Sequence, residues 1–183
     1  MRHFGVLVAL AVAGMLAFGP AAMGDAIIVD DADGSPAFVT DQAWDGTVDR
    51  PDYWGTGFVI SRNISGTSTA TFTPDLPEAG VYDVFMWVPG GASWAWSAAA
   101  PVTVNYDGGS DSMTINQEED TAQWNWIGRY TFAAGTGGSL VLSGEDLSGE
   151  WSVADAVKFE YVPEPASLLV LAVGVPLLLR RRA

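Results

Sequence analysis

Tryptophan and aspartate are the residue types in this chain whose positions suggest chemistry. Trp94 and Trp96 stand among Gly, Ala and Ser in the stretch 89–101, and Tyr53 and Trp54 lie in a second loop-like stretch. An aromatic face can stack on the C–H face of a sugar ring, because the negative ring face meets polarised C–H groups while apolar area is buried. We therefore predict that these four rings form a ligand platform.

The alternative for each of these four rings is that it folds back over the core, because large aromatic side chains are mostly buried. Trp87, Trp124 and Trp126 lie inside strand-like patterns, so we expect these three in the core. Trp44 and Trp151 fit either environment. The tryptophans are therefore divided between a core and a platform.

A group of aspartates suggests a metal site. Asp30 and Asp33 end the first apolar run, and Asp155 interrupts the last one inside Val-Ala-Asp-Ala-Val, where a lone carboxylate would be costly. The first and last strands of a sandwich often run side by side, and calcium prefers oxygen ligands. We predict a structural Ca²⁺ site formed by Asp30, Asp33 and Asp155. The alternative is a solvated acidic turn, with Asp155 capped by backbone amides.

Composition excludes several function classes. The sequence has no cysteine, and its one histidine, His3, lies in the N-terminal segment, so no Ser-His-Asp or Cys-His chemistry is available to the rest. Residues 25–161 hold four basic residues and 21 acidic ones, a formal balance of −17. Such a charge repels nucleic acid and anionic membranes and leaves neutral glycans, cations or basic surfaces as partners. The alternative is that the charge serves solubility alone.

Short β-branched and aromatic runs separated by turn residues predict an all-β fold. Alternation at Ala70 and Phe72 indicates one wet face, whereas the run 81–88 is apolar on both faces except at Asp83. We predict a two-sheet antiparallel β-sandwich, jelly-roll-like, in a single domain over residues 25–161. The expected strands are 26–30, 56–61, 67–74, 80–88, 101–106, 111–116, 124–133, 138–143 and 153–161.

The two ends of the chain predict export. Residues 1–24 have a basic start, an uncharged apolar stretch and a small-residue exit, the pattern of a signal peptide removed by signal peptidase. Residues 162–183 contain a 14-residue apolar segment, shorter than the roughly 20 residues that an upright transmembrane helix needs. By the positive-inside rule its terminal arginines would stay in the cytoplasm.

This tail resembles a PEP-CTERM sorting signal. The matching residues are Pro163, Glu164 and Pro165, the apolar segment, and Arg180, Arg181 and Arg182. The resemblance implies transient insertion in the inner membrane as a short transmembrane helix, followed by cleavage by exosortase. The product would reach the cell surface, the outer membrane or the extracellular matrix. An ordinary short C-terminal anchor is the alternative.

The segment between the two ends resembles golvesin C-terminal-like domains and the carbohydrate-binding module of some xanthan lyases. The similar segments include IIVDDAD, DYWGTGF, GVYDVFMWVPGG, QWNWIGRYTF and VADAVKFEY, in this order. The resemblance implies a β-sandwich that is appended to secreted enzymes and suspected of sugar binding. The two tryptophans of the stretch 89–101 match no family position.

These observations predict an exported, non-catalytic module that binds or organises extracellular polysaccharide. One alternative is a structural or adhesion protein of the matrix, with protein partners and no sugar site. Another is a small hydrolase that uses two carboxylates, but 21 acidic residues guarantee chance pairs, so their number is no evidence for it.

Overall fold

The computed structural model describes residues 26–41, 44–47, 50–61, 68–91, 96–144 and 151–163. The expected signal peptide, the end of the tail beyond Pro163, and Trp94 lie outside these ranges. The described elements are β1 (Ile27–Asp30), η1 (Asp31–Asp33), β2 (Phe38–Thr40), β3 (Trp44–Thr47), β4 (Phe58–Ser61), β5 (Thr69–Phe72), β6 (Gly80–Val88), β7 (Ala100–Tyr106), β8 (Gly109–Ile115), β9 (Gln123–Phe132), β10 (Ser139–Ser143), β11 (Ser152–Ala154) and β12 (Ala156–Tyr161).

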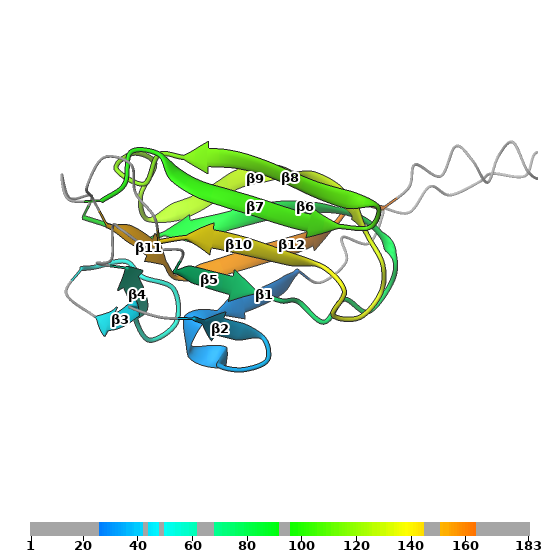
Figure 1. Cartoon of the computed structure of the whole chain (residues 1–183), viewed down its shortest axis with the longest axis horizontal. Helices are drawn as coiled ribbons and strands as arrows, with labels where there is room; N and C mark the ends of the chain where they lie inside the picture. Colours follow the sequence, from blue (N-terminus) through cyan, green and yellow to red (C-terminus); the bar gives the residue numbers. More distant parts are fainter. Residues whose placement is uncertain are drawn as a thin grey trace, which may run out of the picture.

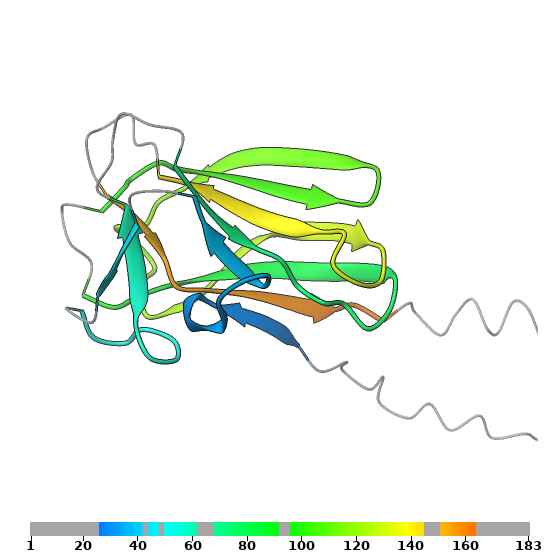
Figure 2. The same ribbon diagram turned by 60° about the horizontal axis from the view of Figure 1, so that its bottom comes forward.

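Two large antiparallel sheets form the body of the molecule (Figure 1). One has the strand order β1-β12-β6-β9, and the other has the order β2-β5-β10-β7-β8. The layers are visible in Figure 2, with the four-stranded sheet below the five-stranded one. This arrangement agrees with the predicted all-β sandwich, to which the structure adds a small third sheet, β11-β4-β3, at one end.

Alternating burial along β6 separates the core from the outer face. Tyr82, Val84 and Met86 are buried, whereas the residues between them are half-buried. Because successive strand residues point to opposite faces, Phe85 and Trp87 belong to the outer face of the four-stranded sheet. The inward residues pack with those of β5, β7 and β10 in one hydrophobic cluster, which holds the two large sheets together.

A second, smaller core lies at the end where the third sheet packs. It contains Phe58, Ile60, Val88, Trp96 and Val153, and we call it the end core. The ring of Trp96 lies 6.2 Å from that of Phe58 and is only 2% exposed. Backbone pairing of this segment with the strand region at Trp151 draws the indole inward. The prediction that Trp96 presents an exposed ring is therefore wrong.

The strand predictions differ from the structure mainly at the short elements. β2 and β3 were not expected: β2 has only three residues, and β3 contains the turn-forming residues Asp45 and Gly46. The last expected strand, 153–161, is divided at Asp155: β11 joins the small sheet and β12 the four-stranded sheet. Within the described residues, no helix has the length and apolar character that crossing a membrane requires.

Strand register places both described ends of the chain at one end of the four-stranded sheet. The start of β1 pairs with the end of β12, Ile27 opposite Phe159, and Tyr161 lies opposite Tyr82. The C-terminal end of β6 and the N-terminal end of β12 lie at the other end of the sheet, where Trp87 is opposite Ala156. Figure 2 shows the start of β1 and the end of β12 at the same end of the sandwich.

Candidate functional site

Three indoles meet on the outer face of the four-stranded sheet. Trp87 of β6 and Trp124 of β9 are opposite each other in the ladder, with ring centroids 5.4 Å apart and an interplanar angle of 73°. Trp54, from the loop before β4, lies 5.4 Å from Trp87 and 4.9 Å from Trp124. All three side chains are half-buried. We call this group the indole cluster; edge-to-face contacts of this kind stabilise aromatic groups.

The loop that carries Trp54 is fixed to the sheet by hydrogen bonds. The backbone N–H of Trp54 donates to Oδ2 of Asp155 at 3.0 Å, and the indole N–H of Trp87 donates to the carbonyl oxygen of Asp52 at 2.9 Å. Asp52 has a φ of 57°, the left-handed conformation that aspartate tolerates better than most residues. The position of the Trp54 ring is thus determined by contacts of its own backbone and of its neighbours.

The outer face continues along β9 to Trp126, whose side chain is 61% exposed. Its indole N–H donates to Oδ1 of Asp83 at 3.1 Å. Asp83 also forms a two-pronged ion pair with Arg129, at 2.9 and 2.7 Å. Phe85 of β6 lies opposite Trp126 in the ladder. The ammonium group of Lys158 lies 4.2 Å from the centroid of the Phe85 ring. Aromatic and charged groups therefore alternate on this face.

A β-bulge explains why Trp126 is outside the core, where the sequence pattern had placed it. The β6–β9 register shifts between Val84 and Phe85, so that Ile127 and Gly128 are consecutively buried. Before the bulge the even-numbered residues of β9 face outward, and after it the odd-numbered residues do. Trp124 and Trp126 are thereby both directed outward, and the expectation that Trp87, Trp124 and Trp126 fill the core is wrong.

The three described residues of the predicted platform are divided between two environments. Tyr53 packs against the end core, with its ring 6.4 Å from that of Phe58, whereas its neighbour Trp54 joins the indole cluster. Trp96 is buried, and Trp94 lies outside the described residues. The sequence did contain a signal that Phe85 and Trp87 lie on the outer face. Side chains two residues apart in a strand lie on the same face, so these two rings share a face with the charged Asp83, which indicates that the face is open to water.

Beneath the Trp54 loop lies a group of three carboxylates, the acid cluster. Oxygens of Asp30, Asp31 and Asp155 lie within 4.8 Å of one another. One oxygen of each carboxylate is buried without a hydrogen-bond partner, and the whole side chain of Asp155 is buried. Two of the three predicted metal ligands are thus brought together, but Asp33 is not: its Oδ2 accepts from the backbone N–H of Asp30 and caps the turn η1.

The electrostatics of the acid cluster favour a bound positive charge. Burial raises the pKa of Asp155 to about 8, and the nearby Asp31 and Asp30 carboxylates add to the rise. Burial, with the charge of Asp30, also raises the pKa of Asp31 to about 6. Unpartnered carboxylate oxygens are ligands that suit Ca²⁺, which takes six to eight oxygens in flexible geometry. These residues therefore fit a calcium ion, with further oxygens from backbone or water.

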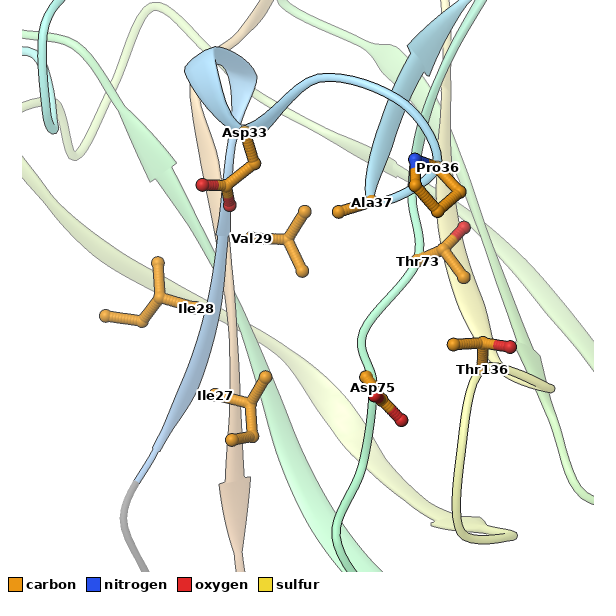
Figure 3. A pocket seen from close by; sticks show the side chains of 9 residues that line it. All are labelled: Ile27, Ile28, Val29, Asp33, Pro36, Ala37, Thr73, Asp75 and Thr136. Carbon is orange, nitrogen blue, oxygen red and sulfur yellow. The ribbon is translucent and has the colours of Figure 1, made fainter.

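A separate cavity of about 400 Å³ opens between β1 and three loop segments, which contribute Pro36 and Ala37, Thr73 and Asp75, and Thr136 (Figure 3). The side chains of Val29 and Ala37 point into it, and the carboxylates of Asp33 and Asp75 lie near its rim. The described residues that line it include no aromatic ring, so it offers small apolar groups and acceptors but no stacking surface.

Comparisons with known proteins agree with the β-sandwich. The sequence profile of the Golvesin C-terminal domain family matches residues 27–161. A xanthan lyase from Bacillus sp. (strain GL1) is 35% identical over 136 residues, which are 73% of this chain and 14% of that enzyme. The chain therefore spans only a small part of the length of this curated relative.

Solved structures also superimpose on this chain. The structure of a Paenibacillus xanthan lyase superimposes with a TM-score of 0.69 at 33% identity, over 75% of this chain and 13% of that one. A family 35 carbohydrate-binding module from an environmental isolate superimposes with a TM-score of 0.51 at 15% identity, over 72% of this chain and 90% of the module. At that identity the second likeness shows the fold alone.

Proposed function

The chain belongs to the Golvesin C-terminal domain family, and on that premise we propose that it is a non-catalytic module that binds polysaccharide outside the cytoplasm. The name of its relative supports this proposal, because xanthan lyase acts on the polysaccharide xanthan. The observation that carries it is the indole cluster, which gathers three half-buried rings on an outer sheet face.

The acid cluster lacks the arrangement of a glycosidase pair, which supports binding over hydrolysis. Glycosidases place two carboxyl groups on either side of the scissile bond, in a site open to a sugar. In the acid cluster, Asp155 is fully buried and accepts a hydrogen bond from the backbone N–H of Trp54, so its carboxylate is not accessible to a sugar. Asp155 instead helps to hold the Trp54 loop in place.

Affinity electrophoresis of the full chain through gels that contain single soluble polysaccharides tests the proposal. Trp54→Ala should lower the affinity for a retarding polysaccharide about tenfold, the equivalent of about 1.4 kcal/mol, because one stacking surface is lost. Val39→Ala is the control, since Val39 is 43% exposed on the other large sheet. Retardation by none of the polysaccharides would contradict the proposal and favour a matrix or adhesion protein with protein partners.

The acid cluster is proposed as a structural calcium site, with Asp30, Asp31 and Asp155 as ligands. When bound, the ion would supply the positive charge that the three buried carboxylates lack. Isothermal titration of the chelator-treated chain with Ca²⁺ should show one site, and the ion should raise the melting temperature. Asp155→Asn should abolish both effects, whereas Asp33→Asn should retain binding. Equal loss in both variants would contradict this ligand set.

Export and processing are part of the same proposal. The expected signal peptide, residues 1–24, and the tail with Pro163, Glu164 and Pro165 would deliver the module across the inner membrane and release it by exosortase. Expression of the full chain with and without exosortase, followed by mass spectrometry of the C-terminus, tests this. Replacement of Arg180, Arg181 and Arg182 by alanine should leave the tail uncut. A full-length C-terminus in the presence of exosortase would contradict the sorting role.

A further inference from the structure

We propose that the ligand is an internal segment of a neutral, β-linked polymer of gluco-configured sugars, which lies along β6 and β9 from the indole cluster to Trp126. This inference rests on the proposed function and extends the same site. The observation behind it is that the outer face of the four-stranded sheet carries two aromatic pairs in succession, Trp87 with Trp124 and Phe85 with Trp126.

The spacing of these pairs sets the minimum size of the ligand. Trp124 and Trp126 are two residues apart on β9 and face the same side, so their backbone positions differ by about 7 Å along the strand. Trp54 packs against both rings of the first pair, 5.4 Å from Trp87 and 4.9 Å from Trp124, and adds a third ring at that position. One pyranose ring cannot cover a row of this length. A ligand that contacts Trp54 and Trp126 together must contain several linked sugars.

Trp126 is held in place before any ligand arrives. Its indole N–H is bonded to Asp83 at 3.1 Å, and the two-pronged pair with Arg129 fixes that carboxylate in turn. A ring with a fixed orientation loses little side-chain entropy on binding, which favours recognition. More than half of its surface remains open to water. A large apolar side chain that is both exposed and anchored is better explained by a partner than by packing.

The chemistry of the face selects the configuration of the sugar. Stacking on an indole is favoured by a pyranose face that carries axial C–H groups and no axial hydroxyl, and both faces of a β-linked gluco-configured ring meet this condition. Equatorial β-1,4-linkages keep successive rings in an extended ribbon that can follow a sheet face, whereas axial linkages turn the chain away from it. The sheet thus favours an extended polymer over a coiled one.

The charges on this face favour a neutral ligand. Arg129 is paired with Asp83 beside Trp126, and Lys158, which lies over Phe85, is paired with Glu160 at 2.9 Å, so these two cations are already neutralised. The residues 25–161 around them carry a formal charge of −17, which repels an anionic polymer. Polar groups of these ion pairs remain beside the rings as donors and acceptors for sugar hydroxyls.

Calorimetry with a graded series of β-1,4-linked glucose oligomers, one to six units long, tests the inference on the full chain. Affinity should rise with length until the oligomer reaches both ends of the row. Trp126→Ala should reduce the affinity for the longest oligomer about tenfold and leave the affinity for the disaccharide unchanged. Trp54→Ala should weaken both, and Val39→Ala should weaken neither. Circular dichroism and melting curves establish that each variant is folded.

The outcomes separate this inference from the proposed function. If a polysaccharide retards the wild-type chain but oligomer affinity does not rise with length, or Trp126→Ala binds the hexamer normally, the inference fails and the proposed function stands. Equal binding of α-linked glucose oligomers, or tighter binding of uronate oligomers, overturns the stated sugar class. If neither a polysaccharide nor an oligomer binds the wild-type chain, the proposed function fails and the inference fails with it.

Discussion

Two tryptophans near the same end of the sandwich have opposite environments. Trp96 is 2% exposed and fills the end core beside Phe58, whereas Trp126 is 61% exposed on the outer sheet face and bonds to Asp83. Consecutive residues of β6 divide these regions: Val88 belongs to the end core, and Trp87 to the indole cluster. The same side-chain type therefore stabilises the fold on one side of a strand and is available to a partner on the other.

The largest effect should come from emptying the end core. Trp96→Ala removes a fully buried indole and should cost about 3–5 kcal/mol of unfolding free energy, the usual range for Trp→Ala in a core. Trp126→Ala should change the unfolding free energy by no more than about 1 kcal/mol, because its ring is mostly in water. Urea denaturation of both variants measures the difference. Equal destabilisation would contradict the division between the two regions.

The bulge in β9 gives a second comparison, between neighbours. Ile127 is 6% exposed and points inward, so Ile127→Ala should cost about 2–4 kcal/mol, whereas the adjacent Trp126→Ala should cost far less. Thermal melting followed by circular dichroism measures both. If the cost at Trp126 were the larger one, the bulge would not place the two side chains on opposite faces.

In the absence of metal, the free energy of unfolding should depend on pH through the buried acid cluster and not through exposed aspartates such as Asp33. Asp155 and Asp31 have pKa values of about 8 and about 6 in the folded chain, above the ordinary 3.8, so the folded state holds more protons than the unfolded state. Their contribution to stability is therefore complete below about pH 4 and is lost as the pH rises to about 8.

Urea denaturation in a chelator at pH 4.5, 6 and 8 measures this loss. Asp155→Asn should flatten the decline, and Asp33→Asn should not, because Asp33 is exposed. An increase of wild-type stability across this range would contradict the raised pKa values. Saturating Ca²⁺ should oppose the decline, since the ion replaces the protons.

The smallest effect concerns the ion pair that holds Trp126. Arg129→Ala should leave the melting temperature nearly unchanged, because exposed ion pairs contribute little to stability. It should nevertheless free Asp83 and loosen the ring, so that acrylamide quenches tryptophan fluorescence more strongly than in the wild type. Arg129→Lys should restore only part of the effect, because lysine lacks the two-pronged geometry. Unchanged quenching in Arg129→Ala would show that Asp83 holds the ring unaided.

Runs of β-branched and aromatic residues bounded by turn residues made part of this fold predictable. The expected strands 80–88 and 138–143 correspond closely to β6 and β10, because each is a short apolar run that is bounded by Gly, Ser or Pro. A bulge breaks the alternation of side chains within β9 without leaving a sequence signal, so Trp126 was placed in the core. Asp30 and Asp155 were correctly brought together by strand order, whereas the choice between Asp31 and Asp33 depended on the turn η1.

The common exit of the two chain ends has a consequence for how the module faces its surroundings. The start of β1 and the end of β12 lie at one end of the four-stranded sheet, and Trp87 of the indole cluster lies toward the other end. A domain or anchor attached through either end of the module would therefore lie on the side away from the indole cluster and would leave that cluster accessible. A long polymer could therefore reach the indole cluster without steric conflict, whether the module is attached through its N-terminal or its C-terminal end.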